Sequence, residues 1–221
     1  MAQAAVRIPQ AALRGVASGV LFMAFFGTLW ACIGIAGLQG WGLPWLLLAA
    51  LLVGSVFFAG GMRLIRASSR LTGQVTSAND QYWKKARRWF GIIFATEGLA
   101  MGVTSAICGA TGHFDLMFPL VALIVGIHFF PLAPLFRMPT HYLTGALLCL
   151  LALGTLFFVP ARAVLGGRQI IAWWVVVGFG STLILWVTGL VIWLVGRRLL
   201  NRDLRQRAQE EQQAGAQGSL A

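Results

Sequence analysis

Six long apolar stretches, separated by short polar segments, dominate the pattern of hydrophobic and polar positions along the chain. They cover residues 16–38, 43–65, 90–112, 116–136, 142–161 and 170–196. Each stretch is close to the roughly 20 residues that an α-helix needs to cross a bilayer. The pattern therefore predicts an all-α fold, a polytopic membrane bundle of six transmembrane helices.

Three regions follow from this division of the chain. Residues 1–14 form an N-terminal tail, residues 15–197 the six-helix transmembrane domain, and residues 198–221 a tail that is first basic and then expected to be disordered. The first apolar stretch follows a basic segment, as the core of a signal peptide does. Its length instead favours an uncleaved spanning helix.

Composition supports a membrane protein. The 221 residues are 58% hydrophobic and 10% charged, whereas soluble domains are nearer 45–50% apolar and about 25% charged. The net charge of +11 is confined almost entirely to the tails and the segments between apolar stretches. Basic residues placed there contact lipid headgroups, so the expected partner is the lipid bilayer and no nucleic acid.

The distribution of basic residues predicts an orientation. Fifteen Lys and Arg residues lie in the tails, in the second and fourth connections or, for Arg63, at the end of the stretch before the second connection, and two, Arg162 and Arg168, lie in the fifth connection. Basic residues concentrate on the cytoplasmic side of membrane proteins. Both termini are therefore predicted to be cytoplasmic.

Small residues recur at spacings of three and four along the third apolar stretch. This small-residue seam consists of Gly91, Ala95, Gly98, Gly102, Ser105, Gly109 and Gly112. In lipid, such a seam allows another helix to approach closely. We expect it to mediate helix packing and the third helix to be central in the bundle.

Two prolines near the end of the fourth stretch predict a helix break. Pro131 and Pro134 each remove a backbone donor from the helix. The carbonyl groups of Ile127 and Phe130 would then lack their helical partners, and we expect the helix to bend or unwind beyond Ile127.

Glu97 is the only acidic residue in any apolar stretch, and His128 is the only histidine deep within one. Glu97 follows Trp89 by eight residues and His128 precedes Phe136 by eight, on consecutive and therefore antiparallel helices. The two side chains are thus expected at the same depth, about 12 Å from the inner boundary at ~1.5 Å per residue. Because charge in hydrocarbon is costly, both should face the interior and meet there.

This polar centre has two interpretations. One is an ion- or substrate-binding site that handles protons or cations; the other is a neutral hydrogen-bonded pair that only holds two helices together. No catalytic pattern, metal site or cofactor-binding motif accompanies it, and the sequence favours a protein that is not an enzyme. His113 and His141 fall near the ends of stretches and are expected to be ordinary interfacial residues.

The segment IVGIHFFPLAPLFR (residues 124–137), followed by HYLTGALLCLLALG (residues 141–154), resembles uncharacterised bacterial six-helix membrane proteins of a domain-of-unknown-function family. The resemblance implies a multi-pass protein of the bacterial cytoplasmic (inner) membrane, with no established activity to transfer. Two functions stay open: a small transporter or permease-like protein, and a non-catalytic membrane scaffold or partner subunit that uses the small-residue seam. A homo-oligomer or an unidentified protein partner is compatible with either.

Overall fold

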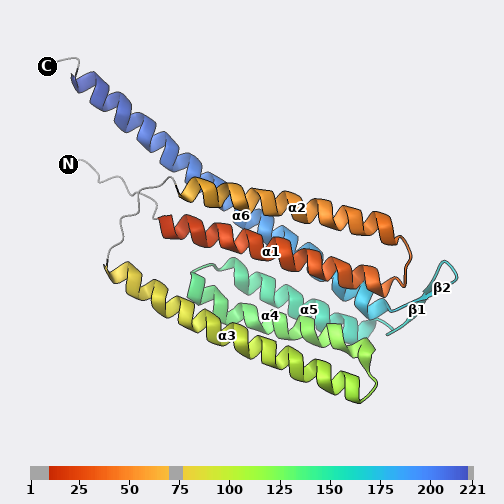
Figure 1. The fold of residues 1–221 in the computed structure, drawn as a ribbon. Helices are drawn as coiled ribbons and strands as arrows, with labels where there is room; N and C mark the ends of the chain where they lie inside the picture. The colour runs from red at the N-terminus through yellow and green to blue at the C-terminus, as the bar shows by residue number, and fades with distance from the viewer. Residues whose placement is uncertain (1–9, 70–76, 219–221) are drawn as a thin grey trace.

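The computed structural model describes residues 10–69 and 77–218. Its elements are α1 (Gln10–Gly37), α2 (Leu43–Ser68), α3 (Ser77–Ala110), η1 (Phe114–Leu116), α4 (Met117–Phe136), α5 (Thr140–Phe158), β1 (Ala163–Leu165), β2 (Arg168–Ile170) and α6 (Ala172–Gly218). The six α-helices run up and down as one elongated bundle (Figure 1). Each is long and apolar enough to cross a membrane, so the prediction of an all-α fold with six helices of spanning length is confirmed. Arg7 of the N-terminal tail lies outside the described residues.

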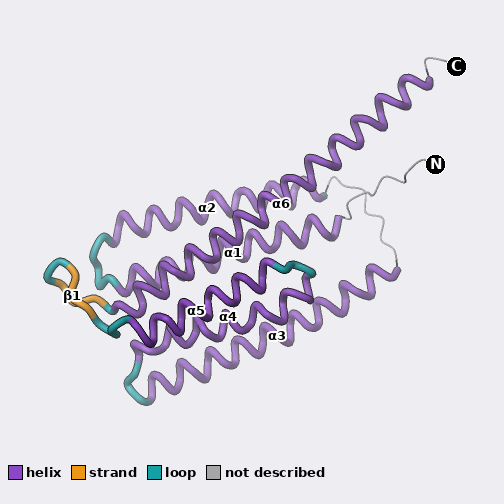
Figure 2. Tube along the Cα trace, turned by 180° about the vertical axis from the view of Figure 1, so that it is seen from behind, coloured by secondary structure: helices purple, strands orange, loops and turns teal. Residues whose placement is uncertain are grey.

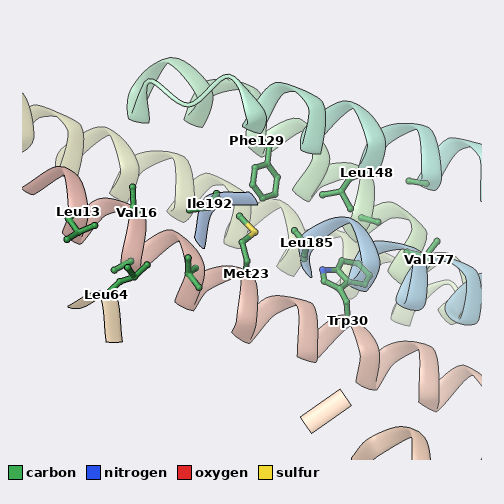
Figure 3. Packing of buried hydrophobic residues seen from close by; sticks show 14 residues of the cluster. Leu13, Val16, Met23, Trp30, Leu64, Phe129, Leu148, Val177, Leu185 and Ile192 are labelled. Atoms are coloured by element: carbon green, nitrogen blue, oxygen red, sulfur yellow. The ribbon is translucent and has the colours of Figure 1, made fainter. Parts of the chain in front are cut away.

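The core of the bundle lies where α1 and α6 pack against each other along most of their apolar lengths. α2 covers α1 on one side, and the α4–α5 hairpin packs against α6 on the other. Buried side chains of several helices meet in one cluster, including Met23, Phe129, Leu148 and Ile192 (Figure 3). The first and last helices are therefore the central ones.

Close backbone approach occurs at two glycine pairs. A Cβ atom on Gly178 of α6 would lie 2.5 Å from the Cα atom of Gly34 of α1. A Cβ atom on Gly145 of α5 would lie 2.7 Å from the carbonyl oxygen of Gly126 of α4. Both crossings need glycine because backbone fills the space that a methyl group would occupy.

The expectation that the third helix is central is wrong. α3 lies at the edge of the bundle (Figure 1), where it packs mainly against α4 and η1. From Lys84 onward its only buried residues are Ala86, Glu97 and Cys108. These share one stripe of the helix, and that stripe faces α4.

The small-residue seam does not pack helices within the described part of the chain. Gly91, Gly98 and Gly102 have no neighbouring atom within 4 Å of an added Cβ, and Ala95 is also exposed. Ser105 and Gly109 are partly buried, and Gly112 has a positive φ in the turn after α3. Gly98 follows Glu97 by one residue, which turns it about 100° away from the face that α4 covers.

α4 does not unwind at Pro131 and Pro134, contrary to one form of the prediction, whereas a bend there stays a prediction. α4 is continuous to Phe136 with both prolines inside it. The helix ends one residue later, where Arg137 adopts a left-handed conformation and its N–H donates to the carbonyl of Pro134. Spanning helices tolerate proline when neighbouring groups and local adjustments compensate for the lost backbone bonds, and α5 packs closely alongside α4 here.

Several segments are more ordered than expected. The segment between the last two apolar stretches forms an antiparallel hairpin, in which Ala163 pairs with Ile170 and Leu165 with Arg168. α3 begins at Ser77, well before the apolar stretch. The tail expected to be disordered is helical to Gly218 as part of α6, and Figure 1 shows it projecting beyond the bundle.

Both ends of the described chain lie at one end of the bundle, and the β1–β2 hairpin lies at the other (Figure 2). The polar ends of α2 and α3 and the basic continuation of α6 share the end that carries the termini. The arrangement therefore separates most of the basic residues from Arg162, which precedes the hairpin, and from Arg168 in β2.

Candidate functional site

Glu97 occupies the middle of the face that α3 turns toward α4. Its neighbours along this face, at helical spacings, are Phe90, Ile93, Met101 and Cys108. The glutamate is 8% exposed, whereas Thr96 and Gly98 on either side of it are exposed. α3 thus presents its only membrane-embedded carboxyl group to the one long helix against which it packs extensively.

His128 meets Glu97 from α4. Its Nδ1 atom lies 3.1 Å from Oε2 of Glu97, and the two side chains are 9% and 8% exposed. The Nδ1 atom has no hydrogen-bond partner, so the two groups lie close together without a formed hydrogen bond. The prediction that these side chains meet is confirmed, while their role in binding stays a prediction.

The antiparallel α3–α4 arrangement explains why these residues meet. A short turn around η1 joins the two helices, so residues equally far from that turn lie side by side. The contact can hold one shared proton in two ways, as carboxyl and neutral imidazole or as carboxylate and imidazolium. Both forms have no net charge, which is the arrangement that hydrocarbon tolerates.

Aromatic rings surround the polar pair of Glu97 and His128 toward the end of the bundle that carries the termini. The ring of Phe94 lies edge-on to His128 at 6.3 Å between centroids, and Phe129 does the same at 5.9 Å. Phe90 stacks on Phe94 and contacts Phe136. These rings form an apolar layer between the polar pair and this end of the bundle.

His141 is buried inside the bundle, whereas an ordinary interfacial residue was expected at this position. It lies in the first turn of α5 and is only 6% exposed. Its ring packs edge-on against Phe129 at 5.5 Å between centroids, and against Phe136 at 6.3 Å. Its Nδ1 atom is buried without a hydrogen-bond partner. His113, by contrast, is exposed in the turn before η1, as expected.

Sequence reasoning also missed a buried hydroxyl pair. The Oγ1 atoms of Thr144 on α5 and Thr188 on α6 lie 2.8 Å apart. Thr144 follows His141 by three residues, so both lie on the same face of α5. The sequence did contain one signal, because His141, Thr144 and Thr155 recur at helical spacings. The structure buries all three on that face of α5.

The rest of the described structure offers no competing polar site of this kind. No three His, Cys, Asp or Glu side chains among the described residues gather as metal ligands. Two grooves of about 430 and 320 Å³ lie along α1 and α2, lined mainly by apolar side chains and sharing Phe25 and Phe58. Neither groove includes Glu97 or His128.

An exposed ion pair closes the opposite end of the bundle. Nε of Arg162 donates to Oδ2 of Asp115 at 2.9 Å, and the indole N–H of Trp174 donates to the Asp115 carbonyl at 3.3 Å. The hydrogen bond to Asp115 raises the pKa of the Arg162 guanidinium above its ordinary value. The arginine thus stays charged at any physiological pH and ties the hairpin segment to η1.

The chain matches no family model, no curated protein and no solved structure.

Proposed function

We propose that this protein is a small transporter or permease-like protein of the bacterial cytoplasmic membrane, with both termini cytoplasmic and Glu97 and His128 as its polar centre. The observation that carries the proposal is the 3.1 Å contact between these two side chains on antiparallel membrane helices. Ionisable residues inside a membrane are costly and are characteristic of ion pathways and proton relays.

The chemistry of the pair suits a proton or a small cation. A carboxyl group beside an imidazole takes up or releases one proton with little movement of heavy atoms. Binding a cation to the carboxylate would compete with that proton, and this competition is how an intramembrane acid couples two species. The location of α3 at the bundle edge adds to this argument, because a helix held mainly by α4 can shift without disturbing the α1–α6 core.

The proposed orientation rests on charge. Fifteen of seventeen Lys and Arg residues belong to the tails and to the connections on the side of the termini. The positive-inside rule favours that side as the cytoplasmic one. The bacterial compartment is proposed from the expected resemblance of residues 124–154 to six-helix membrane proteins.

A liposome assay tests the proposal. The full chain is reconstituted into phosphatidylethanolamine–phosphatidylglycerol vesicles that contain a pH-sensitive dye, and proton flux is followed under an imposed membrane potential. We expect flux from the wild type, none above empty vesicles from Glu97→Gln, and normal flux from Thr96→Ala, the exposed neighbour on α3. Equal flux in Glu97→Gln and wild type would remove the polar pair from the mechanism, and a silent wild type would refute proton transport.

One observation favours a second function, a membrane scaffold or partner subunit. The small-residue seam of α3 is open along Gly91, Gly98 and Gly102, and such a face in lipid allows close approach by a helix of another chain. In this second function, the contact between Glu97 and His128 would only hold α3 in the orientation that exposes the seam to the partner helix. Gly102→Cys should then form a disulfide-linked species in native membranes, while Ile107→Cys, on another exposed position of α3, should not.

A further inference from the structure

His141 is the feature of the site that the polar pair does not explain. The histidine is buried among apolar neighbours at the start of α5, and its Nδ1 atom has no hydrogen-bond partner. A buried polar atom without a partner costs free energy. Phenylalanine or leucine would fill the same space without that cost, so packing alone does not account for a histidine here.

The position of His141 links the polar pair to the end of the bundle with the termini. The residue lies in the first turn of α5, next to the turn that follows α4, whereas Glu97 and His128 lie deeper in their helices. Phe129 contacts the imidazole of His128 and that of His141 edge-on, so a single phenyl ring borders both.

The remaining groups at this level are few. Glu97 faces His128 from α3, Thr144 and Thr188 place hydroxyl groups between α5 and α6, and Arg137 adds a fixed positive charge at the turn before α5. The two threonine hydroxyls have three short contacts, with each other and with the carbonyls of Thr140 and Ile184, but only two hydrogens to donate. The hydrogen bonding beside His141 can therefore rearrange.

We propose that His141 is the relay through which protons reach and leave Glu97 and His128 from the end of the bundle that carries the termini. This proposal rests on the proposed transport function. It adds the end of the bundle from which protons enter and leave the polar pair. Imidazole suits this role because it accepts a proton on one nitrogen and releases one from the other.

The proton transfers balance. A proton taken up by one nitrogen of His141 forms the imidazolium, and loss of the proton from its other nitrogen restores the neutral ring. His128 accepts the proton that His141 releases, and its ring turns to aim the Nδ1–H at Oε2 of Glu97, 3.1 Å away, where the proton is donated. The net change is one new O–H bond on the Glu97 carboxyl, and the reverse sequence removes it.

Time-resolved infrared spectroscopy of the full chain in lipid nanodiscs tests the relay. The C=O stretching band of the protonated Glu97 carboxyl is identified by its loss in Glu97→Gln, and its rise is timed after a rapid pH drop. We expect His141→Asn to reach the same final band but at least about tenfold more slowly. The control is Tyr142→Phe, the exposed next residue, which should respond as fast as the wild type.

Chemical rescue separates a relay from a structural role. In His141→Ala, imidazole added to the buffer should restore the rate of Glu97 protonation without changing the melting temperature. A His141→Asn protein as fast as the wild type would overturn the relay. If that variant does not fold, His141→Gln replaces it. The ¹⁵N signals of His141 in the wild type give a check without any variant, because a ring locked in one tautomer while Glu97 becomes protonated would also refute the relay.

The flux assay distinguishes the two proposals. Flux that requires Glu97, together with Glu97 protonation that is indifferent to His141, would reject the relay and keep the transport function. Glu97 protonation that slows without His141, in a protein that moves no protons across vesicles, would keep the relay and reject transport.

Discussion

A single methyl group at the α1–α6 crossing should destabilise the protein more than the same methyl group on the seam of α3. In Gly178→Ala the new Cβ atom would lie 2.5 Å from Cα of Gly34 and 2.9 Å from the carbonyl oxygen of Trp30. Both neighbours are backbone atoms of α1, so no side-chain rotation relieves the clash. The two central helices must separate instead.

The size of the effect follows from two opposing terms. Overpacking a close contact costs typically 1–3 kcal/mol, and unyielding backbone atoms favour the upper end, about 3 kcal/mol. Alanine regains about 1 kcal/mol over glycine from helix propensity. The net loss is about 2 kcal/mol, which corresponds to a fall of roughly 4–8 °C in melting temperature for a chain of this size.

Gly102→Ala is the matched control. An added Cβ there has no atom within 4 Å, so only the propensity gain of up to about 1 kcal/mol applies. Both variants are purified in the same detergent, and unfolding is followed by tryptophan fluorescence during heating. A Gly178→Ala protein that melts no lower than Gly102→Ala would refute the assignment of α1 and α6 as the closely packed centre.

Two further predictions concern the core and the orientation. Thr188→Val removes the hydrogen bond to Thr144 and should lower the free energy of unfolding by about 0.6 kcal/mol. The same melting assay measures this loss. A loss of stability above about 2 kcal/mol would mean that the hydroxyl pair belongs to a larger network. Ser69 and Gln169 are both exposed, and each is replaced by cysteine in a cysteine-free background. A membrane-impermeant maleimide should label Ser69→Cys only from the cytoplasmic side and Gln169→Cys only from the periplasmic side. Labelling of both from the periplasm would refute the orientation.

The polar pair was predictable because its placement depends on only three regularities. The helix rise is constant, consecutive spanning helices are antiparallel, and a lone carboxyl group in hydrocarbon faces a partner. Counting residues from the inner boundary therefore placed Glu97 beside His128. His141 was not predictable in this way, since a histidine at the end of an apolar stretch is commonly interfacial. Its burial depends on Phe129 and Phe136, which reach it from a different helix.

The sequence by itself determined the six spanning helices, because long apolar runs have no stable place in water and backbone groups in lipid must bond within a helix. Only the tertiary structure decided which helices are central. Inside a membrane, lipid is as apolar as a leucine side chain, so hydrophobicity no longer separates inward from outward faces. Small residues show where helices are able to approach closely. α3 offers such a face at Gly91, Gly98 and Gly102 without a neighbouring helix, whereas Gly34 and Gly178 form the close crossing of α1 and α6. Complementary surfaces from distant parts of the chain set that difference, and no local pattern contains it.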